Sequence, residues 1–248
     1  MNLAIYGGTF DPVHRGHLEV ARAAADHYSL DRVLFIPAGH PPHRPRSPGA
    51  PFEHRCRMVE IACQADPRFA VSRLEAPDGE RGVHYSIDTL HRVRAELAPG
   101  ARLLFIIGTD AFAEIRSWHR WNEILSLVEF IVVSRPGREL DNNEAPEGSR
   151  VHWLRTVNVP ISSTQIRAHL ARGESVDAWL APGVADYIRA NGLYGPPKES
   201  LDVAGESVHD RSQRRDCSSL EGQAAGAKSS RSDPRRDQVP KNSPPLQK

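Results

Sequence analysis

Short apolar runs alternate with stretches of helical spacing along the first 195 residues of the chain. The runs are rich in β-branched residues and have the length of strands that are buried on both faces. Between them, apolar residues recur at intervals of three or four, as Leu18, Ala21 and Ala25 do, which predicts amphipathic helices. The expected strands are Leu3–Tyr6, Val33–Ile36, Phe69–Ser72, Leu103–Ile107, Phe130–Val133 and a weaker Val151–Leu154.

Strands that alternate with helices in this way indicate an α/β fold of the Rossmann type, in which helices cover both faces of a parallel sheet. The pattern ends near residue 195, because residues 196–248 contain no Phe, Tyr or Trp and only scattered apolar residues. Such a segment cannot bury enough apolar surface to offset the entropy lost on ordering. We therefore expect one folded domain over residues 1–195 and a disordered polar tail over residues 196–248.

The charges of the chain are nearly balanced, with 32 Lys and Arg against 31 Asp and Glu in 248 residues. This balance provides no overall field that would attract nucleic acid or a lipid surface, so neither is an expected partner. No apolar run reaches the roughly 18 residues of a membrane-spanning helix, and the N-terminus lacks the basic start of a secretion signal. Cys56, Cys63 and Cys217 form an odd number without metal-ligand spacing, which favours reduced thiols and a cytoplasmic location.

Two histidines and several glycines follow the first predicted strand, within residues 7–17. The paired glycines are expected to form a tight turn whose backbone N–H groups can face an anion. His14 and His17 lie three residues apart at the start of the next predicted helix, so both rings can reach one side near the positive end of the helix dipole. This arrangement predicts a phosphate site, with Gly16 allowing close approach. A metal site is not expected, because no third ligand stands at a suitable spacing and Glu19 is expected to face solvent.

Two further segments place polar residues where ligands bind in α/β sheets, beyond the carboxyl ends of strands. Ser163, Thr164 and Arg167 lie near the predicted start of a helix, where hydroxyls, free N–H groups and a guanidinium can converge on a polyphosphate. Taken alone, this segment is better explained as an ordinary capped helix; together with the histidine pair, it favours a phosphate site. Gly108 and Asp110 follow another strand, where the carboxylate can accept hydrogen bonds from a ribose, although taken alone this pattern is more often a plain turn.

The segment Gly7–His17 resembles the opening motif of nucleotidyltransferases with an (H/T)-x-G-H signature, and Ile161–Arg167 is similar to a second motif of the bacterial nicotinate-nucleotide adenylyltransferases among them. The likeness spans residues 1–195 and ends at the tail. It implies a Rossmann-like nucleotidyltransferase domain in which His14, His17 and Arg167 are catalytic. The residues that it places in contact with ATP are Gly7, Gly8, Thr9, Phe10, Gly16, Gly108, Asp110, Ser163 and Thr164.

The acceptor side of the same family is also recognisable in the sequence. His43 and Arg44 resemble a basic loop that meets a mononucleotide phosphate; Arg44 stands where Lys is commoner, so the charge is kept while its geometry changes. Tyr85 and Thr89 match the segment that holds the nicotinate carboxylate. Trp118 falls where the family stacks an aromatic ring on the pyridine, and an indole face suits an electron-poor ring.

The resemblance implies adenylyl transfer from ATP to nicotinate mononucleotide, which gives nicotinate adenine dinucleotide and pyrophosphate in NAD biosynthesis. The attacking phosphate has a second pKa near 6 and is mostly ionised at pH 7, so neither a general base nor a covalent intermediate is required. Mg²⁺ is expected to enter with ATP and to bridge its phosphates with few protein ligands. No tightly bound cofactor is expected.

Other functions are compatible with the same motifs. The acceptor could be pantetheine phosphate or nicotinamide mononucleotide, or the chain could be a nucleotide-binding regulator without catalysis, although retention of both histidines and Arg167 speaks against a regulator. A role of the tail as an RNA-binding or partner-binding arm has weak support, because its charge is nearly balanced and it lacks aromatic residues. The sequence leaves open the choice between nicotinate and nicotinamide, the oligomeric state and the role of the tail.

Overall fold

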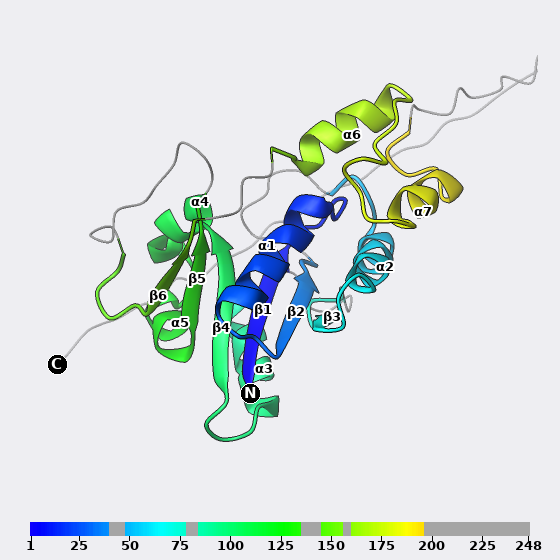
Figure 1. The fold of residues 1–248 in the computed structure, drawn as a ribbon. Coiled ribbons are helices and arrows are strands. Elements are labelled where there is room, and N and C mark those ends of the chain that lie inside the picture. The colour runs from blue at the N-terminus through cyan, green and yellow to red at the C-terminus, as the bar shows by residue number, and fades with distance from the viewer. Residues whose placement is uncertain (40–47, 78–83, 135–144, 156–159, 196–248) are drawn as a thin grey trace, which may run out of the picture. The chain divides into compact units, whose positions relative to one another are not determined.

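The computed structural model describes residues 1–39, 48–77, 84–134, 145–155 and 160–195, which belong to the unit Met1–Glu199; the second unit is Ser200–Lys248. Within the described part, six parallel strands form one sheet in the order β3-β2-β1-β4-β5-β6 (Figure 1). This is the order of a doubly wound Rossmann-type sheet, whose switch point lies between β1 and β4. The strands are β1 (Asn2–Gly8), β2 (Arg32–Pro37), β3 (Phe69–Val71), β4 (Arg102–Gly108), β5 (Glu129–Val133) and β6 (Val151–Leu154).

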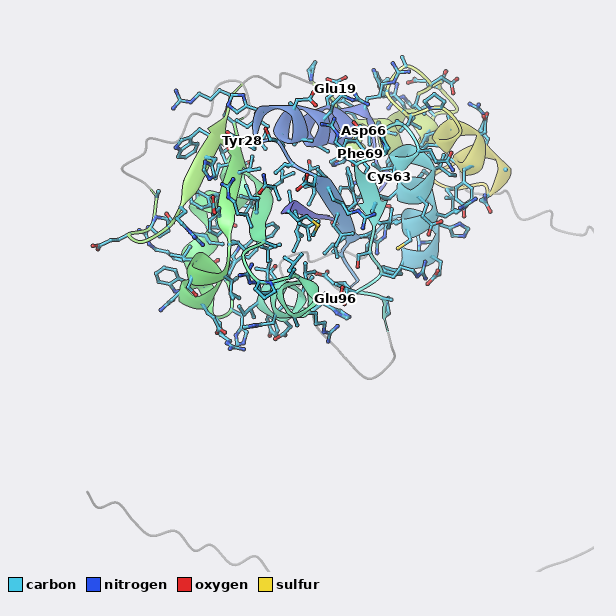
Figure 2. The ribbon with its side chains drawn as sticks, turned by 60° about the horizontal axis from the view of Figure 1, so that its bottom comes forward. Glu19, Tyr28, Cys63, Asp66, Phe69 and Glu96 are labelled. Atoms are coloured by element: carbon cyan, nitrogen blue, oxygen red, sulfur yellow. The ribbon has the colours of Figure 1, made fainter. Side chains whose placement is uncertain are left out.

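Helices cover both faces of the sheet, as Figure 2 shows for α1 on one side and α3 on the other. Alternate strand residues supply the two cores: Ala4 packs into the cluster under α1, whereas Leu3 and Ile5 pack into the cluster under α3. One face carries α1 (Arg15–His27), α2 (Phe52–Cys63), α6 (Ser163–Ala171) and α7 (Val184–Ala190). The other carries α3 (Ser86–Glu96), α4 (Thr109–Ala113), the 3₁₀ turn η1 (Ile115–Ser117) and α5 (Trp121–Leu127).

The expected strands and the fold class are confirmed. Cys56 and Cys63 are buried on α2, and burial raises the pKa of their thiols to about 11 and about 12, so both stay protonated near neutral pH. No helix in the described ranges is long and apolar enough to cross a membrane. The expected tail, residues 196–248, lies outside the described residues.

The expected glycine turn after the first strand is wrong. Gly7 and Gly8 continue β1 and pair with Ile36 and Pro37 of β2. The turn comes later, at Asp11 and Pro12, and Phe10 just before it has a φ of 50°. A Cβ at position 8 would lie 3.0 Å from the Phe10 ring and would crowd it, so glycine leaves room for this ring. The physical reason is that parallel pairing with β2 satisfies the backbone of both glycines, so the strand extends through them.

A charged cluster at the start of β5 gives the domain a predicted acid sensitivity. Glu129 accepts hydrogen bonds from Arg102 at 2.6 Å and from His152 at 2.8 Å. These bonds, that of Arg102 first, lower the pKa of Glu129 from 4.5 to about 2. A carboxyl whose pKa is lower in the folded state stabilises the fold above its unfolded pKa, and this contribution is lost as the pH falls from 4.5 to about 2.

We expect Glu129→Gln to lower the free energy of unfolding at pH 7 by about 2 kcal/mol, less than the full shift implies because Arg102 is partly exposed. The variant should also lose less stability than the parent between pH 4.5 and pH 2. Urea unfolding at several pH values checks this, with Glu96→Gln on the exposed end of α3 as the control. An unchanged pH dependence in the Glu129 variant would contradict the prediction.

Candidate active site

A cavity of about 260 Å³ lies at the carboxyl ends of β1 and β4, the switch point of the sheet. Gly7, Gly8 and Thr9 line it from the first strand and its continuation, and residues 106–108 line it from β4. Ile36 and Ala38, at and after the end of β2, line it as well, so residues from the ends of three strands meet at one edge. This is the place where an open α/β sheet binds ligands.

The two histidines of the motif meet at the start of α1. His14 precedes the first helical residue and is 7% exposed, and its ring stacks on that of His17 with 3.8 Å between centroids. The backbone N–H of His14 donates to Nδ1 of His17 at 3.2 Å. Nδ1 is therefore an acceptor, so a neutral His17 ring carries its proton on Nε2 and can donate from there. Gly16 is buried in the same turn.

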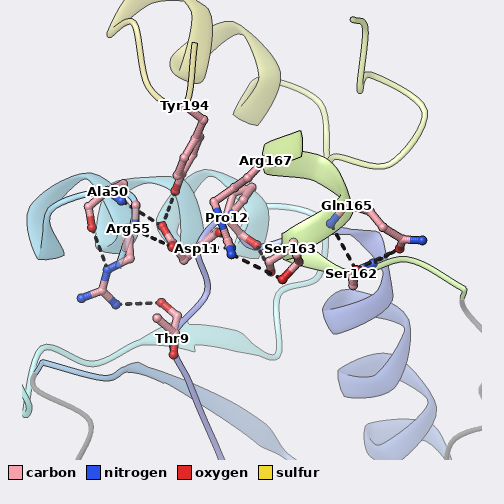
Figure 3. Close-up of polar contacts among 12 residues, drawn as sticks. Thr9, Asp11, Pro12, Ala50, Arg55, Ser162, Ser163, Gln165, Arg167 and Tyr194 are labelled. Carbon is pink, nitrogen blue, oxygen red and sulfur yellow. Dashed lines mark hydrogen bonds and ion pairs between the residues drawn. The ribbon is translucent and has the colours of Figure 1, made fainter. Parts of the chain in front are cut away.

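The start of α6 is docked onto the segment that follows β1. The Ser162 hydroxyl accepts from the backbone N–H of Gln165 and caps the helix. The Ser163 hydroxyl donates to the carbonyl of Pro12 at 2.9 Å, and Nη1 of Arg167 donates to the carbonyl of Asp11 at 2.6 Å (Figure 3). These bonds bring a helix from near the end of the domain against the histidine segment.

Two of the hydroxyls expected at the phosphates have protein partners in this structure. Ser163 is bonded to Pro12, as described, and the hydroxyl of Thr164 accepts from Nη2 of Arg167 at 3.4 Å. Arg167 is about one-third exposed, with 30% of its side chain accessible. Its guanidinium therefore binds the segment after β1 through Nη1, on a side chain that is partly open to solvent.

Aromatic side chains form one wall of the cavity. Trp118 and Tyr85 both line it, and the ring of Tyr85 lies 4.4 Å from that of His119. Trp118 packs edge to face on Phe105 of β4, with 6.1 Å between centroids. An aromatic ring of a ligand would find several flat partners in this cavity.

Thr89 is near the aromatic wall but is not among the residues that line the cavity. Its side chain is buried, and its hydroxyl donates to Glu75 at 2.9 Å. Glu75 lines the cavity and also accepts from the backbone N–H of Gly39, and burial raises the pKa of its carboxyl. A Cβ at position 39 would lie 2.0 Å from the carbonyl oxygen of Glu75. Glu75 thus ties the chain after β2 to α3.

The other expected site residues differ in how they lie. Phe10 is 2% exposed and its ring packs on Tyr6, Phe35 and His17, so only its main chain can face a ligand. Gly108 and Asp110 are exposed at the end of β4 and the start of α4, and Cβ space at Gly108 is open. His43 and Arg44 lie outside the described residues.

Sequence reasoning missed a buried arginine that is bonded to two residues of the cavity lining. Arg55 on α2 is 1% exposed and its guanidinium donates to the carbonyls of Ala50, Thr9 and Ala38 at 3.1, 2.7 and 2.8 Å. It therefore fixes the backbone after β1 and after β2 at once. The available signal was a charged residue next to the apolar stripe of α2. Glu75 was missed as well, although it follows a predicted strand as the recognised residues do.

The described residues contain no group of three or more His, Cys, Asp or Glu that could hold a metal ion. Glu19 is exposed on α1 and points away from the sheet (Figure 2). The site offers imidazoles, hydroxyls, backbone N–H groups and a guanidinium, which are donors suited to oxygen anions. This donor set can hold phosphates, and a divalent cation would be held mainly by those phosphates.

The chain is similar to known proteins over the part that carries these residues. The sequence model of the cytidylyltransferase-like family matches residues 5–169. A Solibacter usitatus protein named nicotinate-nucleotide adenylyltransferase is 51% identical over 194 residues, which is 78% of this chain and 100% of that protein. A protein of the same name from Corynebacterium kroppenstedtii is 42% identical over 195 residues, 78% of this chain and 91% of that protein.

Solved structures share the fold. The nicotinic acid mononucleotide adenylyltransferase of Plasmodium falciparum complexed with APC superimposes with a TM-score of 0.61 at 22% identity, over 78% of this chain and 96% of that one. The same enzyme complexed with NaAD gives a TM-score of 0.60. At this identity the likeness bears on the fold alone.

Proposed function

The chain belongs to the nicotinate-nucleotide adenylyltransferases within the cytidylyltransferase-like family, and we propose that it transfers the adenylyl group of ATP to nicotinate mononucleotide. The reaction yields nicotinate adenine dinucleotide and pyrophosphate and is a step of NAD biosynthesis. One observation of the geometry carries the proposal. The segment after β1 lines an aromatic cavity with Gly7–Thr9 and then continues to His14 and His17 under Arg167.

In the proposed reaction, the ionised phosphate of the mononucleotide attacks the α-phosphate of ATP, and pyrophosphate leaves. The bond to the attacking oxygen forms as the bond between α-phosphate and β-phosphate breaks. The protein holds two polyanions in line and stabilises the charge that builds on the transferred and leaving groups. His17 donates from Nε2 and His14 acts beside it on the α- and β-phosphates, while Arg167 acts on the β- and γ-phosphates.

The remaining nucleotide contacts follow the family motif. The main chain of Gly7, Gly8, Thr9, Phe10 and Gly16 approaches ATP, with Ser163 and Thr164 at its phosphates. Gly108 and Asp110 lie beside the adenylate. For Ser163, a phosphate contact through the hydroxyl requires that ATP share or replace its bond to Pro12. The Thr164 hydroxyl accepts from Arg167 and therefore keeps its own proton to donate to a phosphate.

ATP enters this reaction as its Mg²⁺ complex. The family uses ATP and a divalent metal, and Mg²⁺ is the cation that most readily bridges phosphates while keeping several waters. The hydrogen-bond donors of the site fit the phosphates of such a complex, and the cation would be coordinated by the ATP phosphates. The proposal also includes a cytoplasmic location, favoured by the odd number of cysteines without metal-ligand spacing.

On the acceptor side, we infer that the pyridine ring stacks in the aromatic wall. Trp118 and Tyr85 provide the flat faces. Thr89 does not contact the substrate directly. Its hydroxyl bonds to Glu75 of the cavity lining and so helps to fix the start of α3 against the cavity. His43 and Arg44 are proposed for the mononucleotide phosphate, with nicotinate adenine dinucleotide occupying both halves of the site after transfer.

A pyrophosphate-release assay tests the function. ATP and Mg²⁺ are combined in turn with nicotinate mononucleotide, nicotinamide mononucleotide and pantetheine phosphate. We expect the highest kcat/KM with nicotinate mononucleotide. A higher value with pantetheine phosphate, or pyrophosphate release with none of the three, would refute the proposal.

The stacking role of Trp118 gives a second prediction. Trp118→Ala removes an aromatic face from the cavity and should raise the KM for nicotinate mononucleotide by about tenfold, with the KM for ATP changed far less. Trp121→Ala is the matched control, because Trp121 packs against the core on the α3 face and is absent from the cavity lining. Equal rises in both KM values for the Trp118 variant would assign that side chain to the core.

A further inference from the structure

A buried carboxylate stands at the centre of the phosphate side of the site. Asp11 is 4% exposed, and its Oδ2 accepts from the backbone N–H of Gly49 at 2.7 Å and lies 3.6 Å from Nη1 of Arg167. Its Oδ1 accepts from the backbone N–H of Ala50 at 3.0 Å and from the hydroxyl of Tyr194 at 2.7 Å. Each oxygen thus faces two donors. A carboxylate placed where polyanions bind needs such compensation, because an uncompensated charge would repel them.

Tyr194 reaches Asp11 across 183 positions of sequence (Figure 3). It follows α7 near the end of the described chain and has a φ of 60°, a conformation that is unfavourable for a bulky side chain. Burial, and then the bond to Asp11, raise the pKa of the Tyr194 hydroxyl above its ordinary value, so it stays a donor at neutral pH. The contacts made by this side chain maintain a backbone conformation that the residue would not choose by itself.

Tyr194 and Arg167 also meet around one glycine. A Cβ at Gly49 would lie 3.1 Å from Cε1 of the Tyr194 ring and 3.2 Å from Cδ of Arg167. The tyrosine ring and the arginine stem therefore enclose the backbone whose N–H groups bind Asp11. The hydroxyl, the carboxylate and the guanidinium form one packed unit.

We propose that Tyr194 is a positioning residue for adenylyl transfer, whose hydroxyl acts through the Asp11 carboxylate to hold the Arg167 guanidinium at the phosphates of ATP. This inference rests on the proposed role of Arg167. Without the hydroxyl, Oδ1 keeps one donor of two, so the carboxylate can turn and its charge is less well compensated. Both changes weaken the binding of a triphosphate next to it.

The test uses the full chain and two tyrosines that differ in their partners. Tyr194→Phe removes the hydroxyl and keeps the ring that packs on Gly49. Tyr187→Phe is the matched control, because its hydroxyl is bonded to His54 at 2.9 Å and not to Asp11. We expect kcat to fall about tenfold in the Tyr194 variant, with the Kd of a non-hydrolysable ATP analogue raised by a similar factor and the KM for nicotinate mononucleotide within about twofold. The Tyr187 variant should stay within about twofold in all three measurements.

A double-mutant cycle separates positioning from a structural role. In an Arg167→Ala background, Tyr194→Phe should have less than about a twofold further effect on kcat and on the Kd of the analogue, because the residue on which it acts is gone. A full additional loss in that background, or equal behaviour of the two tyrosine variants, would overturn the inference. Circular dichroism checks that the variants are folded. Gly49→Ala crowds the side chains of Tyr194 and Arg167, so it should also lower kcat and raise the Kd of the ATP analogue.

The two proposals fail in different ways. If the parent chain does not turn over nicotinate mononucleotide, the proposed function fails, and the analogue Kd values of the same variants still decide the role of Tyr194. If the parent is active and Tyr194→Phe matches Tyr187→Phe in kcat and Kd, the inference fails while the function stands.

Discussion

Replacing His17 with alanine is expected to lower kcat by about 10²-fold or more, within the range seen when one transition-state donor is lost. In the proposed reaction, Nε2 of His17 donates to phosphate oxygens that gain charge as pyrophosphate leaves. The bond from the backbone N–H of His14 to Nδ1 fixes the ring and its tautomer before ATP arrives. Because alanine removes the donor and leaves the cavity wall in place, the KM for the mononucleotide should change by no more than about twofold.

Steady-state pyrophosphate release measures kcat and KM of the variant, and circular dichroism checks that its fold is unchanged. His27→Ala is the control, since His27 is exposed at the other end of α1. His17→Gln places an amide N–H near the position of Nε2 and should recover part of the loss. Near-normal turnover of His17→Ala would remove His17 from the catalytic group.

Replacing Arg55 with methionine is expected to lower the free energy of unfolding by about 3 kcal/mol. Methionine fills much of the same volume but donates no hydrogen bond, so the carbonyls of Thr9, Ala38 and Ala50 lose this donor inside the protein. The carbonyls of Thr9 and Ala38 belong to segments that line the cavity. Activity should therefore fall together with stability, and urea unfolding of the full chain measures the stability change.

Arg57→Met on the same helix is the matched control. Its ion pair with Glu60 is exposed, and such a pair contributes between about 0 and 1 kcal/mol. Arg55→Lys keeps the positive charge, but an ammonium group lacks the planar set of donors with which the guanidinium reaches three carbonyls. Its free energy of unfolding should therefore lie between those of the parent and Arg55→Met. A loss below about 1 kcal/mol in Arg55→Met would show that water or neighbouring groups satisfy the carbonyls.

Hydrophobic spacing determined the fold in advance. Leu103–Ile107 and Phe130–Val133 are too apolar to be half-exposed strands, so a parallel sheet covered on both faces was the arrangement that could bury them. The histidine pair was also predictable, because residues three apart at a helix start share a side of that helix. Local spacing was a poorer guide to the end of β1, where pairing with β2 carried the strand through both glycines.

For other parts of the site, the local signal did not reveal the contact that the residue makes. From the sequence, Thr89 was predicted to contact the acceptor substrate. Only the folded chain brings the Glu75 carboxylate to its hydroxyl. In the sequence, Arg55 is one charged residue beside an apolar stripe. In the structure, the segments after β1 and β2 place two carbonyls within hydrogen-bond distance of its guanidinium. In each case, the partner is a group from a distant segment whose position depends on the whole sheet.

The sequence by itself determined the α/β fold, the edge of the sheet at which the cavity lies and the histidine pair proposed to face a phosphate, because these depend on periodicity and on neighbours a few positions apart. Only the tertiary structure decided how those residues are held. Asp11 meets Gly49 from the segment before α2, Arg167 from α6 and Tyr194 from beyond α7, because the fold packs these three segments around one buried carboxylate. Hydrogen bonds and charge compensation act over a few ångströms in space, whatever the separation along the chain, so a single sequence does not reveal them.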